Sequence, residues 1–129
     1  MSTSTKSTEI TEPVLLIRIN QMYSPGMSTQ ALYEATRGVW VIGERREKVQ
    51  YAFAVADGVV REIYEIHTWH PAASTPYTTR PLHDVSHKGR WEFVGELAPE
   101  AIREKYVDCS VADYFSRGAA NPIMYVNVP

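Results

Sequence analysis

All four histidines of the chain lie in one window, as His67-x-x-His70 followed by His83-x-x-x-His87. Imidazole suits Zn²⁺, and paired histidines at short spacing are one way to build a tetrahedral metal site. The single cysteine, Cys109, is distant in sequence, and histidine spacing without cysteine is a weak match to known zinc patterns. We therefore expect solvated or locally hydrogen-bonded histidines and no cofactor, with a metal site at these four residues as the alternative.

Aromatic and arginine side chains gather in and around the same window. Aromatic faces stack on nucleobases, and a guanidinium group offers cation–π contacts and paired donors to phosphate. A long loop that folds over the open face of a sheet would bring these side chains to one concave pocket. The candidate ligand-binding residues are Trp40, Trp69, Tyr77, Trp91, Arg37, Arg80 and Arg90.

The three tryptophans of this set need not all contact a ligand. Tryptophans on short strands usually pack into a core, so at least one of Trp40 and Trp91 is expected there. Trp69, next to Pro71 in the expected loop, is the better ligand candidate.

A charged run, Glu44–Lys48, separates two of the apolar segments. With Arg37 and Lys88 it would form a basic rim for phosphates, which position a nucleic acid but do not specify its sequence. Mixed-sign runs are more often solvated turns with self-paired charges. We expect the solvated turn.

Side chains suited to acid–base or nucleophilic catalysis are also present: Ser74, His83, Asp84 and Ser86 in the window, and Cys109 further along the chain. The chain has no Gly-x-Ser-x-Gly elbow, no glycine-rich phosphate loop and no Glu-x-Lys pattern of a nuclease hairpin. An enzyme, either a hydrolase or a metal-dependent enzyme acting on a nucleotide-like substrate through His67, His70, His83 or Asp84, is therefore an alternative. A protein-interaction module with aromatic hot spots is a second alternative.

These residues must be positioned by short strands and helices. Apolar and alternating runs predict strands, which are Val14–Ile19, Val39–Ile42, Tyr51–Ala56, Val59–Ile66, Arg90–Gly95 and Pro122–Val128. Capping residues predict helices over Thr29–Thr36 after Ser28, from Pro99 to Tyr106, and from Ser110. Gly38 is expected to end the first helix, and Asp57-Gly58 predicts a hairpin turn.

The segment from His67 to Trp91 contains three prolines and a Ser/Thr run, which we take to exclude regular helix. A long ordered loop inside a compact domain is usually functional. The element order favours an α+β fold, with a mostly antiparallel curved sheet or small pseudo-barrel and short capping helices.

The composition indicates one ordinary globular domain. The chain has 129 residues, of which 44% are hydrophobic and 22% charged. We expect a disordered tail over residues 1–12 and a single domain over 13–129. No signal-peptide h-region and no apolar run of about 20 residues is present, so a cytoplasmic protein without a membrane partner is expected. The net charge of −2 excludes a global basic field.

Several segments together resemble a small uncharacterised prokaryotic family similar to the PUA-like superfamily, with its ASCH, EVE and YTH branches. The resemblance covers roughly residues 14–128 and rests on element order and aromatic placement. The matching segments are Ala31–Trp40, Tyr51-Ala-Phe-Ala, Arg61–Ile66, Arg90–Gly95 and Asn121-Pro122-Ile123. It implies a PUA-like pseudo-barrel with a helix after the first strand and a ligand pocket on the open face.

Members of that superfamily mostly bind RNA or modified bases, and some ASCH members are reported as hydrolases. The sequence and the resemblance together favour a small non-enzymatic binding module. Its expected ligand is RNA, DNA or a modified nucleobase, held in the aromatic and arginine pocket.

Overall fold

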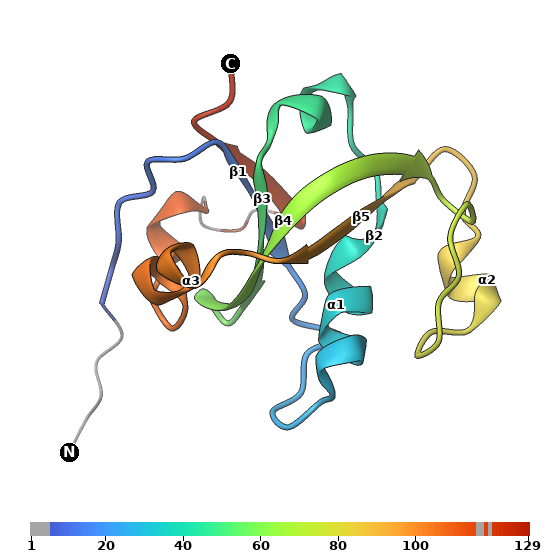
Figure 1. Ribbon diagram of the computed structural model, residues 1–129, viewed down its shortest axis with the longest axis horizontal. Helices are drawn as coiled ribbons and strands as arrows, with labels where there is room; N and C mark the ends of the chain where they lie inside the picture. The colour runs from blue at the N-terminus through green and yellow to red at the C-terminus, as the bar shows by residue number, and fades with distance from the viewer. Residues whose placement is uncertain (1–5, 116–117, 119) are drawn as a thin grey trace.

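The computed structural model describes residues 6–115, 118 and 120–129. It is an α+β structure in which one mixed six-stranded sheet curls into a half-barrel, with few and short helices (Figure 1). The strand order is β2-β5-β4-β3-β1-β6. The strands are β1 (Val14–Arg18), β2 (Gly38–Trp40), β3 (Tyr51–Ala56), β4 (Val59–Pro71), β5 (Trp91–Leu97) and β6 (Ile123–Val126).

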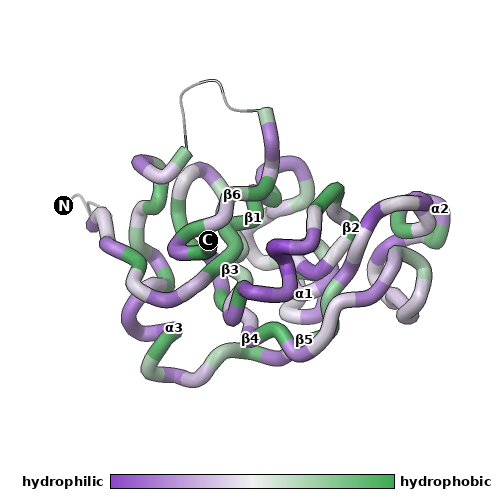
Figure 2. The backbone as a smooth tube through the Cα atoms, turned by 90° about the horizontal axis from the view of Figure 1, so that it is seen from above, coloured by the Kyte–Doolittle hydropathy of each residue, from purple (hydrophilic) through white to green (hydrophobic). Residues whose placement is uncertain are grey.

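The sheet is mostly antiparallel, as predicted, but it is mixed. Strands β1 and β3 are parallel, and the other neighbouring pairs are antiparallel. The turn at Asp57 and Gly58, both with positive φ, joins β3 to β4 as a hairpin. In Figure 2 hydrophobic stretches gather where β1, β3 and β6 lie side by side.

Strand β3 lies near the middle of the sheet and is buried along its whole length. Its large side chains, such as Phe53, face one core cluster, while Ala52 and Ala54 face the other. Helix α1 (Thr29–Arg37) contacts β3, and the small alanine side chains allow this close approach. One face of β3 is therefore lined by small alanine side chains.

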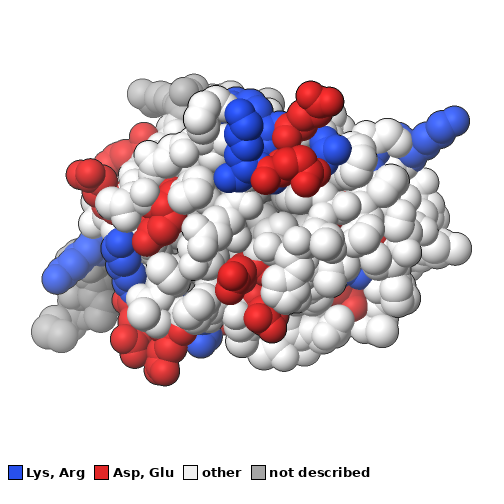
Figure 3. All heavy atoms as spheres, turned by 45° about the horizontal axis from the view of Figure 1, so that its top comes forward, with Lys and Arg blue, Asp and Glu red and all other residues white. Residues whose placement is uncertain are grey.

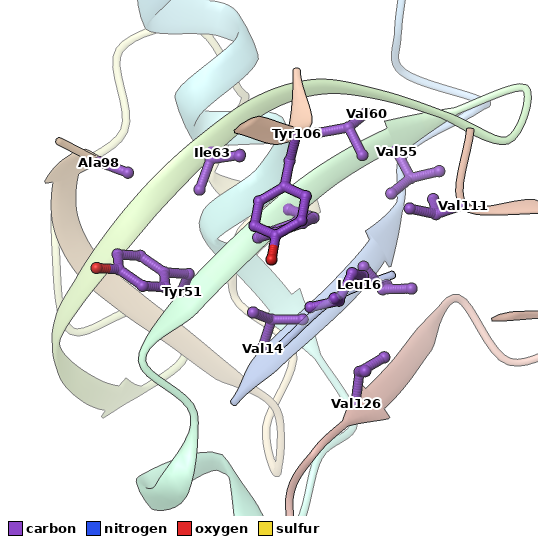
Figure 4. Packing of buried hydrophobic residues seen from close by; sticks show 12 residues of the cluster. Val14, Leu16, Tyr51, Val55, Val60, Ile63, Ala98, Tyr106, Val111 and Val126 are labelled. Atoms are coloured by element: carbon purple, nitrogen blue, oxygen red, sulfur yellow. The ribbon is translucent and has the colours of Figure 1, made fainter. Parts of the chain in front are cut away.

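The first core cluster is closed by α3 (Glu100–Tyr106). The ring of Tyr106 lies 5.2 Å from that of Phe53, in the middle of the cluster (Figure 4). Its hydroxyl donates to the Glu12 carboxylate at 2.5 Å. Ile10 is 3% exposed in the same cluster. These contacts place Ile10 and Glu12 in the domain, although both belong to the expected tail; residues 1–5 lie outside the described residues.

Helix α1 begins at the predicted residue and ends one residue later than predicted, at Arg37, immediately before Gly38. The Ser28 hydroxyl accepts a hydrogen bond from the backbone N–H of Ala31 at 3.0 Å. Gly38 follows the last helical residue, but its backbone is extended and already belongs to β2. A side chain at Gly38 would collide with the Tyr77 hydroxyl, so this close approach, and not a left-handed cap, explains the glycine.

The histidine-rich window differs from the expected loop at two places. Its first five residues extend β4 to Pro71, because they pair with β5 in the register Trp69↔Phe93 and His70↔Glu92. A one-turn helix, α2 (Leu82–Val85), follows Pro81, so the exclusion of helix was wrong. The φ of Pro81, −66°, suits a residue immediately before a helix, and its carbonyl accepts from the Asp84 N–H.

Two short 3₁₀ helices complete the chain. The first, η1 (Glu44–Lys48), is formed by the charged run, and the second, η2 (Ala112–Tyr114), follows Ser110. None of the helices in the described part of the chain has the length and apolar character needed to cross a membrane.

Candidate functional site

A cavity of about 560 Å³ opens where the chain leaves β1. One wall is β2 with Trp40, another is the segment after β1 around Asn20, and a third is the loop between β4 and β5. The lining side chains include three arginines, Arg18 from the end of β1 and Arg80 and Arg90 from the loop between β4 and β5. The cavity therefore combines guanidinium groups with an aromatic edge.

The arginines of the cavity differ in how far other residues hold their side chains in place. Arg18 lies at the end of β1, where it donates to the Asn121 carbonyl at 2.6 Å and stacks over the Phe115 ring at 4.6 Å. Arg90 precedes β5, and its side chain is exposed. Asp84 of α2 also lines the cavity, so its lining is not uniformly positive.

Arg80 is held by the end of α1. Its Nη1 donates to the carbonyl oxygen of Glu34 at 3.0 Å and to that of Gly38. Burial lowers the pKa of Arg80, and the neighbouring Tyr77 and Asp84 partly offset this effect. An arginine remains charged at neutral pH despite such a shift. Arg80 is therefore a fixed cation at the cavity wall.

The loop that carries Arg80 is fastened to α1 by a fully buried carboxylate, that of Glu34. Thr78 and Thr79 each donate their backbone N–H and their hydroxyl to it, at distances between 2.6 and 3.1 Å. Gln30 adds its side-chain amide at 2.6 Å. Burial alone would raise the pKa of Glu34, but these hydrogen bonds outweigh it and lower the pKa to about 2. The carboxylate is thus held ionised inside the protein.

A second buried carboxylate, Glu92 of β5, fastens the beginning of the same loop. It accepts from the Ala73 N–H at 3.3 Å, from the Tyr77 hydroxyl at 3.2 Å and from the Thr75 hydroxyl. Arg37, 4% exposed, lies 4.0 Å from this carboxylate. We call this network, together with the hydrogen bonds of Glu34, the loop anchor.

Arg37 also holds the loop by itself. Its guanidinium donates to the Thr75 hydroxyl and to the Pro76 carbonyl, both at 2.7 Å, and stacks on the Tyr77 ring at 3.8 Å. Burial raises the pKa of Tyr77, an effect that Arg37 opposes and Glu92 reinforces. Arg37 and Tyr77 therefore serve the loop anchor, and neither lines the cavity.

The predicted aromatic side chains do not converge on the cavity, although Trp40, Trp69 and Trp91 all lie in or against one core cluster. Trp40 is a core residue, as expected of at least one tryptophan, and its indole N–H donates to the Thr36 carbonyl at 2.8 Å. Trp69 packs edge-on against Phe93 at 5.3 Å, and Trp91 lies under the guanidinium of Arg46 at 3.5 Å. Of the seven predicted ligand-binding residues, the structure brings Trp40, Arg80 and Arg90 to the cavity.

The charged run does not form the basic rim considered above, because Arg37 is buried. Within η1, Arg46 lies 3.2 Å from the carboxylate of Glu47, as expected of a self-paired turn. On the face drawn in Figure 3, acidic and basic side chains form small adjacent groups separated by uncharged surface.

The four histidines have separate surroundings. His67 lies 3.5 Å from Glu96, the ring of His70 shares a hydrogen bond with Thr68, and His83 lies 3.2 Å from Asp84. Among the described residues, no group of three or more His, Cys, Asp or Glu side chains is placed to hold a metal ion.

Sequence reasoning missed Glu34, Glu92 and Arg18. Two features of the sequence pointed to Glu34. It is three residues from Arg37, which puts both on one face of a helix. The loop between β4 and β5 is also rich in threonine. A carboxylate supplies the acceptors, and hydroxyl-bearing residues supply the donors, of a buried hydrogen-bond network. Nothing in the local sequence separates Arg18 from other residues at a strand end.

Comparisons with known proteins add no assignment: no family model, curated protein or solved structure matches the chain.

Proposed function

We propose that the protein is a small binding module that takes a phosphate-bearing ligand, a nucleotide or a short segment of RNA or DNA, in the cavity beside β1. The supporting observation is that Arg18 at the end of β1 lines one cavity of about 560 Å³ together with Arg80 and Arg90 of the loop between β4 and β5. Phosphate oxygens accept paired hydrogen bonds from guanidinium groups, and this volume suits a small ligand.

The loop anchor supports this proposal by positioning the cations in advance. Because Arg80 is bonded to the end of α1, little side-chain entropy is lost when it meets a ligand. Trp40 and Asp84 belong to the same lining. They would contact the base of a nucleotide, whose exocyclic amines donate to a carboxylate.

A PUA-like relationship is part of the same proposal. It is supported by the curled sheet, by the helix that follows the first strand, and by a cavity at an open side of the sheet. The catalytic alternative has less support, because His67, His70 and His83 do not converge and, of the four residues considered for it, Asp84 alone lines the cavity.

The proposal is tested by Arg90→Ala, since Arg90 is exposed and its side chain can be removed without disturbing the core. Binding is measured by fluorescence anisotropy with labelled single-stranded RNA and DNA, and by calorimetry with adenosine monophosphate. Loss of one charge-assisted phosphate contact should weaken binding by about tenfold or more.

Lys88→Ala is the matched control. It removes a cation two residues from Arg90 that does not line the cavity, and it should change the dissociation constant less than about twofold. The proposal is overturned if the parent protein binds none of the three probes, or if both variants weaken binding equally.

A further inference from the structure

A second concave site lies between α1, β4, β5 and α3. Its volume is about 330 Å³. The apolar part of its lining comes from Leu32 and Tyr33 of α1, Tyr64 of β4 and Leu97 of β5. Leu97 is half exposed, so an apolar surface is open to a ligand at this place. We call this site the tyrosine groove.

The two tyrosines of the groove have different roles. The Tyr33 hydroxyl is already used, because it accepts from the Gly95 N–H at 3.0 Å and donates to the Gly95 carbonyl at 3.1 Å. The side chain of Tyr64 packs against the Tyr33 ring at 5.2 Å and is only 3% exposed. No described residue is placed to hydrogen bond its hydroxyl. A hydroxyl that is not used within the protein can form a hydrogen bond with a ligand in the groove.

The polar rim of the tyrosine groove is acidic on balance. Glu62 is joined to Arg103 by two hydrogen bonds, at 2.8 and 2.9 Å, so these charges compensate each other. Glu96 also lines the groove, and its carboxylate is exposed. Burial, reinforced by the charge of Glu62, raises the pKa of Tyr64, so its hydroxyl stays protonated at neutral pH. The rim favours a cationic group over an anionic one.

We propose that the tyrosine groove binds a small aromatic amine. The ring lies against Leu32, Tyr33 and Leu97, a polar atom of the ring bonds the Tyr64 hydroxyl, and the ammonium group faces Glu96. This site is separate from the arginine-lined cavity and has the opposite charge preference. It goes beyond the function proposed above and does not depend on it.

Two probes with the same ring and opposite charges test this proposal: tryptamine and indole-3-acetate. Each is titrated into the ¹⁵N-labelled full chain, and amide chemical shifts are followed. We expect tryptamine to shift the amides of Thr29, Gly95 and Leu97, and to bind about threefold or more tightly than indole-3-acetate. Tyr64→Phe should weaken tryptamine binding about fivefold, because it removes one hydrogen bond.

Tyr125→Phe is the matched control, since it also removes a tyrosine hydroxyl without a hydrogen-bond partner, and Tyr125 does not line the groove. It should leave tryptamine binding unchanged, and the dispersion of the amide spectrum checks the fold of both variants. The proposal is overturned by the absence of tryptamine binding, by shifts confined to the arginine-lined cavity, or by equal effects of the two variants.

Discussion

Glu34 is the residue on which the geometry of the loop depends most. A fully buried carboxylate is costly unless hydrogen bonds replace its hydration, and here Thr78, Thr79 and Gln30 supply them. The same residue accepts Arg80 through its backbone carbonyl. One residue of α1 thus anchors the loop and positions a cation of the proposed binding cavity.

The pH dependence of stability should reveal this anchor. The pKa of Glu34 in the folded protein is about 2, below its ordinary value of 4.5. A lowered folded pKa means that the stabilisation is complete above pH 4.5 and is lost as the pH falls toward 2. Over that window the parent protein should lose about 3 kcal/mol of unfolding free energy that Glu34→Gln does not lose.

Urea unfolding of the parent and of Glu34→Gln, at several pH values between 2 and 7, measures this difference. Glu44→Gln is the control, because it removes an exposed carboxylate of η1 that anchors no loop. Parallel curves for the parent and Glu34→Gln would show that the carboxylate is not held ionised in the folded protein.

At the scale of elements, the join between α1 and β2 is packed against the loop. The Cβ of any residue larger than glycine at position 38 would collide with the Tyr77 hydroxyl and lie 3.0 Å from the Glu92 Cβ. Gly38→Ala should therefore destabilise the protein by about 1–3 kcal/mol. Gly43→Ala, where an added Cβ meets nothing within 4 Å, should change stability by less than about 1 kcal/mol.

Chemical denaturation of both variants tests this expectation, and Tyr77→Phe supplies a further check. Phenylalanine lacks the hydroxyl that collides with the new methyl group, so Gly38→Ala should cost less in the Tyr77→Phe background than in the parent. Equal costs in the two backgrounds would rule out the collision as the cause.

The elements that sequence reasoning predicted well are those specified by local chemistry. Strand β3, the Asp57-Gly58 turn and the N-terminus of α1 follow from alternation, turn residues and a serine cap. The last five residues of β4 were missed because their hydrogen bonds come from β5, about twenty residues further along the chain. The loop anchor was missed for the same reason: its partners meet only after α1 and β5 are in place.

On the face drawn in Figure 3, the charged side chains lie in small groups of either sign. The net charge is −2, yet three described arginines, Arg18, Arg80 and Arg90, line the same cavity. The tyrosine groove has the opposite balance. The face drawn in Figure 3 shows no extended basic area of the kind that drives salt-sensitive binding along a nucleic acid. We therefore expect the proposed ligand to be bound at one place.

The salt dependence of oligonucleotide binding distinguishes binding in one cavity from binding along an extended surface. Each neutralised phosphate of a single strand contributes a slope of about −0.7 to the plot of log K against log salt concentration. Three arginines, Arg18, Arg80 and Arg90, should give a slope of about −2, and Arg90→Ala should reduce it by about one phosphate. A slope steeper than about −4, or one that Arg90→Ala leaves unchanged, would mean that phosphates are bound outside the cavity.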